Sequence, residues 1–133
     1  GEFSEVISRH GGEDNAFTGR GYTAYYQHIA AEHLELALRL EADRMTDLVL
    51  DEREFQRERS VVQEERTQRV DDNPQALTFE RLRAAAFPSS PARNPIIGWP
   101  ADIASMRLEQ LDRWYDQWYA PNNAALVVVG DAG

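Results

Sequence analysis

Apolar residues recur every three or four positions over most of the chain, which is the spacing of a helix with one buried face. This periodicity predicts five helices, which cover residues 1–10, 31–48, 51–70, 74–87 and 102–119. Between the first two lie short β-prone runs at 15–18 and 22–29, and the intervening Gly19-Arg20-Gly21 has the composition of a hairpin connection. The apolar run Ala125 to Val129 predicts a third strand, buried and paired in the same sheet. Consecutive strands joined as a hairpin favour an α+β, two-layer fold with a mostly antiparallel sheet over a doubly wound α/β order.

Local sequence signals set the ends of these elements. Asp51 and Glu54 form an Asp-based relative of the capping box, so the third helix is expected to begin there. It should end before Pro74, which can occupy the first turn of the next helix. Residues 88–100 contain four prolines and must form a loop or an extended connector. Because the chain opens on a glycine rather than on Met and closes on a strand and turn, we expect 1–133 to be a single partial domain, truncated at both ends.

Composition excludes several classes of protein. At 133 residues with 42% hydrophobic content, the chain is long enough for one modest core. The 14 basic and 23 acidic residues give a net charge of −9, which argues against a nucleic-acid partner because that binding rests on clustered Lys and Arg. No apolar run is long enough to predict a membrane span. Without cysteine, disulfides and thiolate ligands are excluded, and any metal must be bound by His and carboxylate groups.

The helix expected at 51–70 carries two acids, Glu58 and Glu65, on the same stripe as Phe55 and Val62. Positions seven apart differ by about 700° of rotation, so the two carboxylates should lie about 10 Å apart on one face. A carboxylate on an apolar stripe is costly to desolvate without a positive partner. Either both acids are surface charges, one of them paired with an arginine of a neighbouring element, or they face a cation in the core. The other charged residues of this helix are expected to serve solvent and i,i+4 pairing, and they include Glu54, Arg57, Glu64 and Arg66.

The three histidines do not complete a catalytic metal site. A catalytic zinc usually takes three protein ligands, often two histidines and a glutamate, and leaves one position for water. Here the closest pair, His28 and His33, is five positions apart and straddles the expected strand-to-helix junction. We expect His28 to be a packed or edge residue and His33 to be solvated. No Ser-His-Asp arrangement or phosphate-binding glycine loop is recognisable, so these residues alone contain no complete active site.

Several motifs, in one order along nearly the whole chain, together resemble a known family. In chain order they read GEFSEVISRHGGEDNAFTGRGYTAYYQHIAAEHLELALRLEADRM, ERSVVQEERTQRVDDNP, IIGWPADIASM and WYAPNNAALVVVGD. They resemble the N-terminal domain of the pitrilysin/insulinase family of zinc metallopeptidases, which includes the mitochondrial processing peptidases. Members of that family carry an inverted zinc motif, His-x-x-Glu-His, in which the histidines bind zinc and the glutamate activates water. Their third ligand is a glutamate about 75 residues downstream, on a helix that reads Glu-Arg-x-Val-x-x-x-Glu.

The resemblance implies different roles for the two acids. The helix motif matches residues 58–65, which assigns Glu65 as the zinc ligand and Glu58 as the catalytic acid that supports the site. Counting back about 75 residues places the His-x-x-Glu-His motif before Gly1. Zinc is therefore expected in the full-length protein, whereas none is expected to bind to this fragment, since it would keep a single ligand. The fragment itself is predicted to be inactive.

The predicted hairpin also gains a role from the resemblance. In the family, the strand that begins Asn-Ala-x-Thr forms the sheet edge to which an extended substrate adds as another strand. Asn15 and Ala16 carry over to that substrate-binding role, with Phe17 nearby. Taken without the resemblance, these three residues are equally well explained as a turn residue and two ordinary strand positions.

The implied function is that of a zinc-dependent endopeptidase that hydrolyses peptides or unfolded polypeptides by metal-activated water. Because the family builds its peptidases from paired homologous halves, a homologous second half or subunit is an expected partner. A non-catalytic partner subunit of the same family is the alternative, and an unrelated acidic interaction module is a third interpretation. An exposed sheet edge is expected to favour self-association of the fragment. A periplasmic location is a guess from exported bacterial relatives.

Overall fold

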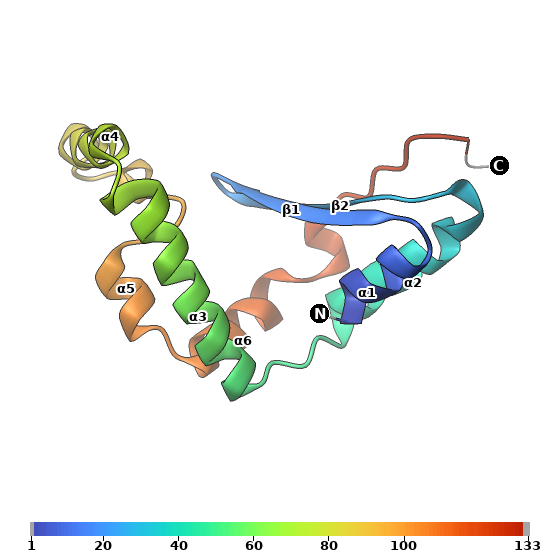
Figure 1. The fold of residues 1–133 in the computed structure, drawn as a ribbon. Coiled ribbons are helices and arrows are strands. Elements are labelled where there is room, and N and C mark those ends of the chain that lie inside the picture. The colour runs from blue at the N-terminus through green and yellow to red at the C-terminus, as the bar shows by residue number, and fades with distance from the viewer. Residues whose placement is uncertain (1, 132–133) are drawn as a thin grey trace. The chain divides into compact units, whose positions relative to one another are not determined.

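The structure is a computed structural model that describes residues 2–131, and these residues form two compact units (Figure 1). The first unit combines the chain up to Val49 with the segment from Trp114 onward. The second unit comprises Leu50–Arg113.

The first unit contains two helices and a β-hairpin. Its elements are α1 (Glu2–Arg9), β1 (Glu13–Gly19), β2 (Tyr22–His28), a 3-10 turn (Ala31–His33) and α2 (Leu34–Thr46). After α1 the chain turns at Gly11, whose φ of 72° is the left-handed conformation that glycine adopts without strain. The strands pair antiparallel, with Gly19 opposite Tyr22 across the two-residue connection, so the predicted hairpin is confirmed.

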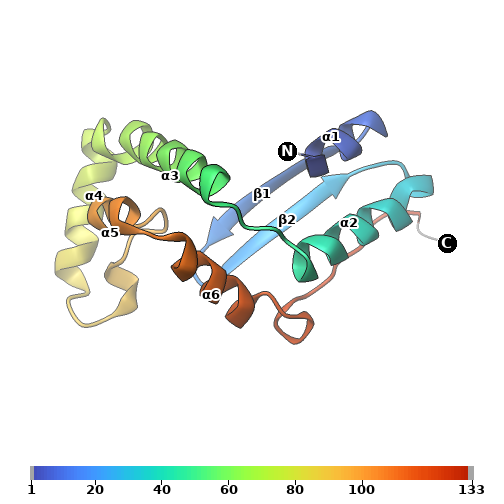
Figure 2. The same ribbon diagram turned by 90° about the horizontal axis from the view of Figure 1, so that it is seen from below.

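Both helices of the first unit lie on the same side of the hairpin, as Figures 1 and 2 show. The Ser4 hydroxyl of α1 donates to the Asp14 carboxylate of β1 at 2.8 Å. From α2, the Arg44 guanidinium lies 3.6 Å from the centre of the Tyr25 ring on β2. The buried apolar side chains of this layer are Ile7 and Ala37. The predicted α+β fold, with helices packed on one face of an antiparallel sheet, is confirmed.

The second unit is helical. It contains α3 (Glu52–Arg66), a π-helical turn (Thr67–Asp71), α4 (Pro74–Ala86), a 3-10 turn (Pro91–Arg93) and α5 (Pro100–Ser105); α6 (Leu108–Trp118) crosses the division between the units. The Asp51 carboxylate accepts hydrogen bonds from the N–H groups of Arg53 and Glu54 at 2.7 and 3.0 Å, which confirms the predicted start of α3. Asn73 caps α4 in the same way, and Pro74 is its first residue.

One helix prediction and one strand prediction are wrong. The predicted helix at 102–119 is two helices, because Met106 adopts an extended backbone and the chain restarts at Leu108. The helix expected to reach Val70 does reach it, because the π-helical turn Thr67–Asp71 continues α3 beyond Arg66. The expected strand Ala125 to Val129 is not formed: the sheet of the described residues consists of β1 and β2, and this segment pairs with neither of them. Its side chains are correspondingly exposed, Val129 by 93%. Within the described part of the chain, we find no helix with the length and apolarity that a membrane crossing requires.

Candidate functional site

Helix α3 displays the two predicted acids on one face. The helix is continuous from Glu52 to Arg66, so Glu58 and Glu65 are separated by seven positions of regular helix, or about 10 Å along the axis. Phe55 on the same stripe is buried, at 7% exposure. The acids are not buried: the Glu58 side chain is 63% exposed and that of Glu65 is 38% exposed. Within this unit, the stripe is therefore buried at Phe55, whereas the carboxylates of Glu58 and Glu65 are accessible to water.

The ion-pair partners of both acids are arginines close in sequence. Arg57 Nη2 lies 3.8 Å from Glu58 Oε1, and Arg69 Nη1 lies 2.9 Å from Glu65 Oε1. Exposed pairs of this kind contribute about 0–1 kcal/mol to stability. Such contacts are typical of surface charges, and they agree with the interpretation that both acids lie at the surface. The roles of Glu58 and Glu65 in catalysis and zinc binding stay predictions.

The donor set around these acids fits zinc in part. The Glu65 carboxylate is anionic and partly accessible, and an oxygen of this type is a normal zinc ligand. Among the described residues, however, no three His, Cys, Asp or Glu side chains gather in a way that could hold a metal ion. Glu65 is thus suited to supply one ligand, and the residues described do not form a zinc site by themselves.

The residue after Glu65 is buried, which the sequence analysis did not foresee. Arg66 was expected to serve solvent, but its exposure is 3%. Its Nη1 donates to Glu80 Oε2 at 2.9 Å and to the Gly98 carbonyl at 2.8 Å, and its Nη2 donates to Glu80 Oε1 at 2.7 Å and to Asp71 Oδ1 at 3.3 Å. The hydrogen bonds that Arg66 donates to Glu80, more than any other contact, raise the pKa of Arg66. Because Glu80 lies on the next helix, helical periodicity gave no signal of this pairing.

The three residues predicted to bind substrate are consecutive on β1, which pairs with β2 alone among the described residues. Gly19 and Tyr22 flank the two-residue connection, so their backbone groups are hydrogen-bonded to each other. Because bonded and non-bonded pairs alternate, the backbone N–H and C=O of Ala16 point away from β2, toward the open edge. The Ala16 N–H donates instead to Asn15 Oδ1 at 2.8 Å. Phe17 is 53% exposed.

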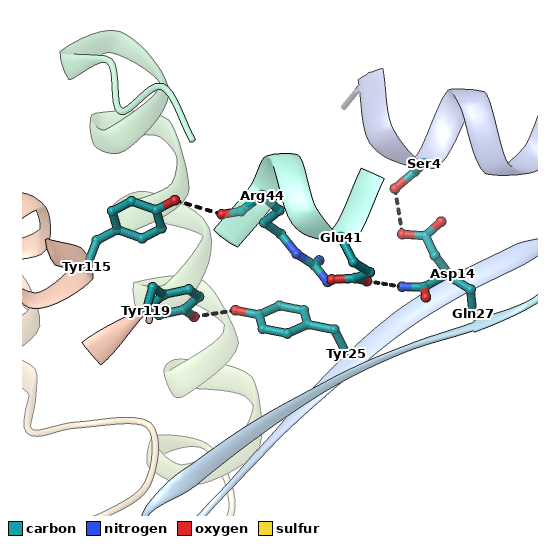
Figure 3. A network of polar contacts seen from close by, with 8 residues as sticks. All are labelled: Ser4, Asp14, Tyr25, Gln27, Glu41, Arg44, Tyr115 and Tyr119. Carbon is teal, nitrogen blue, oxygen red and sulfur yellow. Dashed lines mark hydrogen bonds and ion pairs between the residues drawn. The ribbon is translucent and has the colours of Figure 1, made fainter. Parts of the chain in front are cut away.

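A polar cluster surrounds Tyr25 of the hairpin (Figure 3). Tyr25, the cross-strand partner of Ala16, shares a hydrogen bond with the Tyr119 hydroxyl and lies against the Arg44 guanidinium. The Tyr115 hydroxyl donates to the Arg44 carbonyl at 2.8 Å. Burial and the hydrogen bond to Tyr25 raise the pKa of Tyr119. The partners in this cluster are far apart along the chain, so no local sequence pattern indicates it.

The cluster extends along the hairpin toward both helices of the first unit. Gln27 of β2 donates to the Glu41 carboxylate of α2, which also pairs with Arg44. At the same end of the hairpin, Asp14 receives the hydrogen bond from Ser4 described above. Because Asp14 and Gln27 are cross-strand partners, both strands of the hairpin are tied to the helical layer at this pair.

Comparison with known proteins gives one family. The profile of the insulinase family, peptidase family M16, matches residues 1–99. The zinc protease PqqE of Helicobacter pylori is 36% identical over 131 residues, which cover 98% of this chain and 30% of that protein. The uncharacterized zinc protease YmxG of Bacillus subtilis is 32% identical over 130 residues, 98% of this chain and 32% of the relative. The chain thus spans about a third of the length of these curated relatives.

Two solved structures share the fold. A protease from Helicobacter pylori superposes with a TM-score of 0.89 at 34% identity, covering 92% of this chain and 30% of that one. An M16-like peptidase from Alicyclobacillus acidocaldarius superposes with a TM-score of 0.76 at 25% identity, covering 92% of this chain and 29% of that one.

Proposed function

The chain belongs to the insulinase family, peptidase family M16, and from this premise we propose that it is part of a zinc endopeptidase that hydrolyses peptides or unfolded polypeptides. The observation that carries the proposal is the position of two acids on α3. Glu58 and Glu65 stand at the ends of the sequence Glu-Arg-Ser-Val-Val-Gln-Glu-Glu, on one face of a regular helix, and both carboxylates reach solvent. Both relatives are named as zinc proteases, which supports zinc as the metal.

We assign different roles to the two acids. The Glu65 carboxylate would bind zinc directly, as the later acid of the motif. Glu58, two turns earlier on the same face, would act as the supporting acid and orient a metal ligand or the attacking water. When bound, zinc would supply a Lewis acid and lower the pKa of water toward neutrality.

The open edge of β1 is the proposed substrate-binding element. An extended peptide would pair with the outward N–H and C=O of Ala16. To do so, it must replace the hydrogen bond that Asn15 Oδ1 accepts from the Ala16 N–H. The exposed ring of Phe17 would contact a substrate side chain on the same face as Asn15, since side chains alternate along a strand. Recognition through the backbone suits an enzyme that reads extended conformation more than sequence.

We further propose that residues 1–133 are a single partial domain, the central and C-terminal part of the peptidase N-terminal domain. Such a part supplies one zinc ligand and one substrate edge, and the remainder of the protein, with a homologous second half or subunit, would supply the rest of the site. The 133 residues alone would then be inactive, because two histidine ligands and the general base are not among them.

The test compares three single substitutions in the complete protein, with zinc content and peptide hydrolysis as readouts. Glu65→Gln replaces an anionic ligand with a poor neutral one and should lose metal and activity together. Glu58→Gln should retain zinc and lower turnover about 10- to 100-fold, since a supporting residue tunes a site without holding the ion. The isolated 133-residue chain with added zinc is the negative control.

Glu64→Gln is the matched control. Glu64 is exposed, lies next to Glu65, and is turned by about 100° around the helix, so its substitution should be nearly silent. If Glu64→Gln removes zinc and Glu65→Gln does not, the assignment is off by one position and the proposal is wrong. If none of the three changes zinc content, the chain does not contribute to a metal site, as in a non-catalytic subunit.

A further inference from the structure

We infer that Arg66 is a positioning residue for Glu65: its buried hydrogen bonds set the rotation of the last turn of α3 and so direct the neighbouring carboxylate. This inference rests on the proposed function, because it concerns the residue assigned there as the zinc ligand.

The guanidinium of Arg66 joins three segments of this unit. Both of its terminal nitrogens bond the Glu80 carboxylate of α4, at 2.9 and 2.7 Å. Nη2 also reaches Asp71 at the end of the π-helical turn, and Nη1 reaches the Gly98 carbonyl in the loop before α5. The side chains of Arg66 and Glu80 are 4% and 8% exposed, so water does not compete strongly for these bonds. Paired parallel bonds to one carboxylate fix a guanidinium in orientation as well as in distance.

Glu65 has no comparable constraint of its own. Its ion-pair partner, Arg69, has a side chain that is 74% exposed, and such pairs hold long side chains loosely. Glu65 and Arg66 are adjacent in the same helical turn, about 100° apart around the axis. When Arg66 points into the unit and is fixed there, Glu65 must point about 100° away from that direction. The direction of the exposed carboxylate is therefore set by the buried neighbour.

A small rotation of this turn would matter to a metal ligand. With side chains, a helix has a radius of about 5–6 Å, so a rotation of about 10° moves a carboxylate by about 1 Å. Zinc–oxygen distances are confined to within about 0.2 Å. Loss of residues that orient a metal ligand typically lowers metal affinity about 10- to 100-fold. We therefore expect zinc affinity to depend on Arg66, although Arg66 does not touch the metal.

Arg66→Lys is the sharpest substitution, because it keeps the charge but removes the planar fork that binds Glu80 through two parallel bonds. The first measurement is made on the 133-residue chain without metal. Since the chain has no cysteine, Glu64→Cys and Arg81→Cys give two unique sites for spin labels, one on α3 and one on α4. We expect a narrow distance distribution between the labels, and we expect Arg66→Lys to shift or broaden it.

Arg53→Lys is the matched control for this measurement. Arg53 is an exposed arginine of the same helix, and its substitution should leave the label distances unchanged. Glu80→Gln provides a second variant, which removes the charge of the partner and should act in the same direction as Arg66→Lys. Identical distance distributions for the parent chain, Arg66→Lys and Glu80→Gln would overturn the inference.

The second measurement is the zinc dissociation constant of the complete protein, by competition with a chelator. Arg66→Lys should raise this constant by about 10-fold or more. Ile7→Ala, in the core of the other unit, should lower stability at least as much and leave the constant within about twofold. If Glu65→Gln weakens zinc binding and Arg66→Lys does not, Arg66 is merely structural and the inference is wrong. If Glu65→Gln leaves zinc binding unchanged, the proposed function fails and the inference falls with it.

Discussion

Two arginines, Arg44 in α2 and Arg66 in α3, each form the centre of a polar cluster, and they are held by different forces. The Arg44 guanidinium lies 3.6 Å from the centre of the Tyr25 ring and pairs with Glu41 of its own helix; its side chain is 21% exposed. The Arg66 side chain is 4% exposed and bonds the carboxylate of Glu80 on a neighbouring helix. Arg44 thus keeps some hydration, whereas Arg66 depends on a counter-charge that is buried with it.

This difference determines how each unit tolerates change. The buried hydrophobic side chains among the described residues are few, namely Ile7, Ala37, Phe55 and Ile103, and the two polar clusters also join segments within their units. A guanidinium stacked on a ring can be replaced by another long side chain that covers the ring. A buried ion pair cannot lose one partner without leaving the other charge unpaired in a poorly solvated place.

The largest effect is predicted for Arg66→Met. The substitution keeps an unbranched apolar side chain and leaves the Glu80 carboxylate, 8% exposed, without its buried partner. We expect the free energy of unfolding to fall by about 3–5 kcal/mol, measured by urea denaturation of the chain near neutral pH. The double variant Arg66→Met/Glu80→Met removes both charges and should recover most of that loss, because a buried pair can often be replaced by apolar side chains at little cost.

The double variant also gives the outcome that would contradict this interpretation. If Arg66→Met and the double variant are equally unstable, the loss comes from missing hydrogen bonds to Asp71 and Gly98 rather than from the unpaired Glu80. Arg66 and Arg44 would then differ in the number of hydrogen bonds that each forms, and not in the burial of a counter-charge.

The elements that the sequence predicted correctly have local causes. The start of α3 follows from the Asp51 carboxylate and its own next residues, and the hairpin follows from glycines that permit its tight connection. The segment Ala125 to Val129 has the composition of a strand but no partner strand among the described residues, and a strand requires one. Composition alone therefore predicts that a segment can pair, and not that it does.

In the candidate site too, features with local causes were predicted and contacts between helices were not. The seven-residue spacing correctly predicted that Glu58 and Glu65 share a face of a regular helix, but it does not say what that face meets. The burial of Arg66 was missed because it depends on Glu80, which lies fourteen positions later on a separate helix. Contacts between elements require the packing of the unit, and a periodic pattern within one helix does not contain that information.

A smaller effect is predicted for Arg44→Met. Methionine keeps an unbranched side chain over the Tyr25 ring and loses the attraction between the cation and the ring together with the Glu41 ion pair. We expect the free energy of unfolding to fall by about 1–2 kcal/mol, in line with a partly desolvated cation–π contact and a partly exposed ion pair. The comparison uses the same urea experiment as Arg66→Met. A loss as large as that of Arg66→Met would show that the two clusters are held alike.

The smallest effect concerns Tyr119 and depends on pH. Burial and the hydrogen bond to Tyr25 raise the pKa of Tyr119 above the ordinary value of about 10, so the folded chain holds this proton more tightly than the unfolded chain does. The resulting stabilisation is complete below about pH 10 and is lost as the pH rises above that value, since the unfolded chain then releases the proton first.

Tyr119→Phe tests whether this stabilisation is lost as the pH rises. At pH 8 the variant lacks the hydroxyl bonded to Tyr25 and should be less stable than the parent chain by about 0.5–1.5 kcal/mol. Phenylalanine does not ionise, so the gap in urea midpoint should shrink when both chains are measured at about pH 10.5. Trp118→Phe is the control, since it changes an exposed neighbouring ring without removing a titratable group, and its gap should be the same at both pH values. A gap for Tyr119→Phe that stays constant or widens with pH would mean that the folded cluster does not hold the Tyr119 proton more tightly than the unfolded chain.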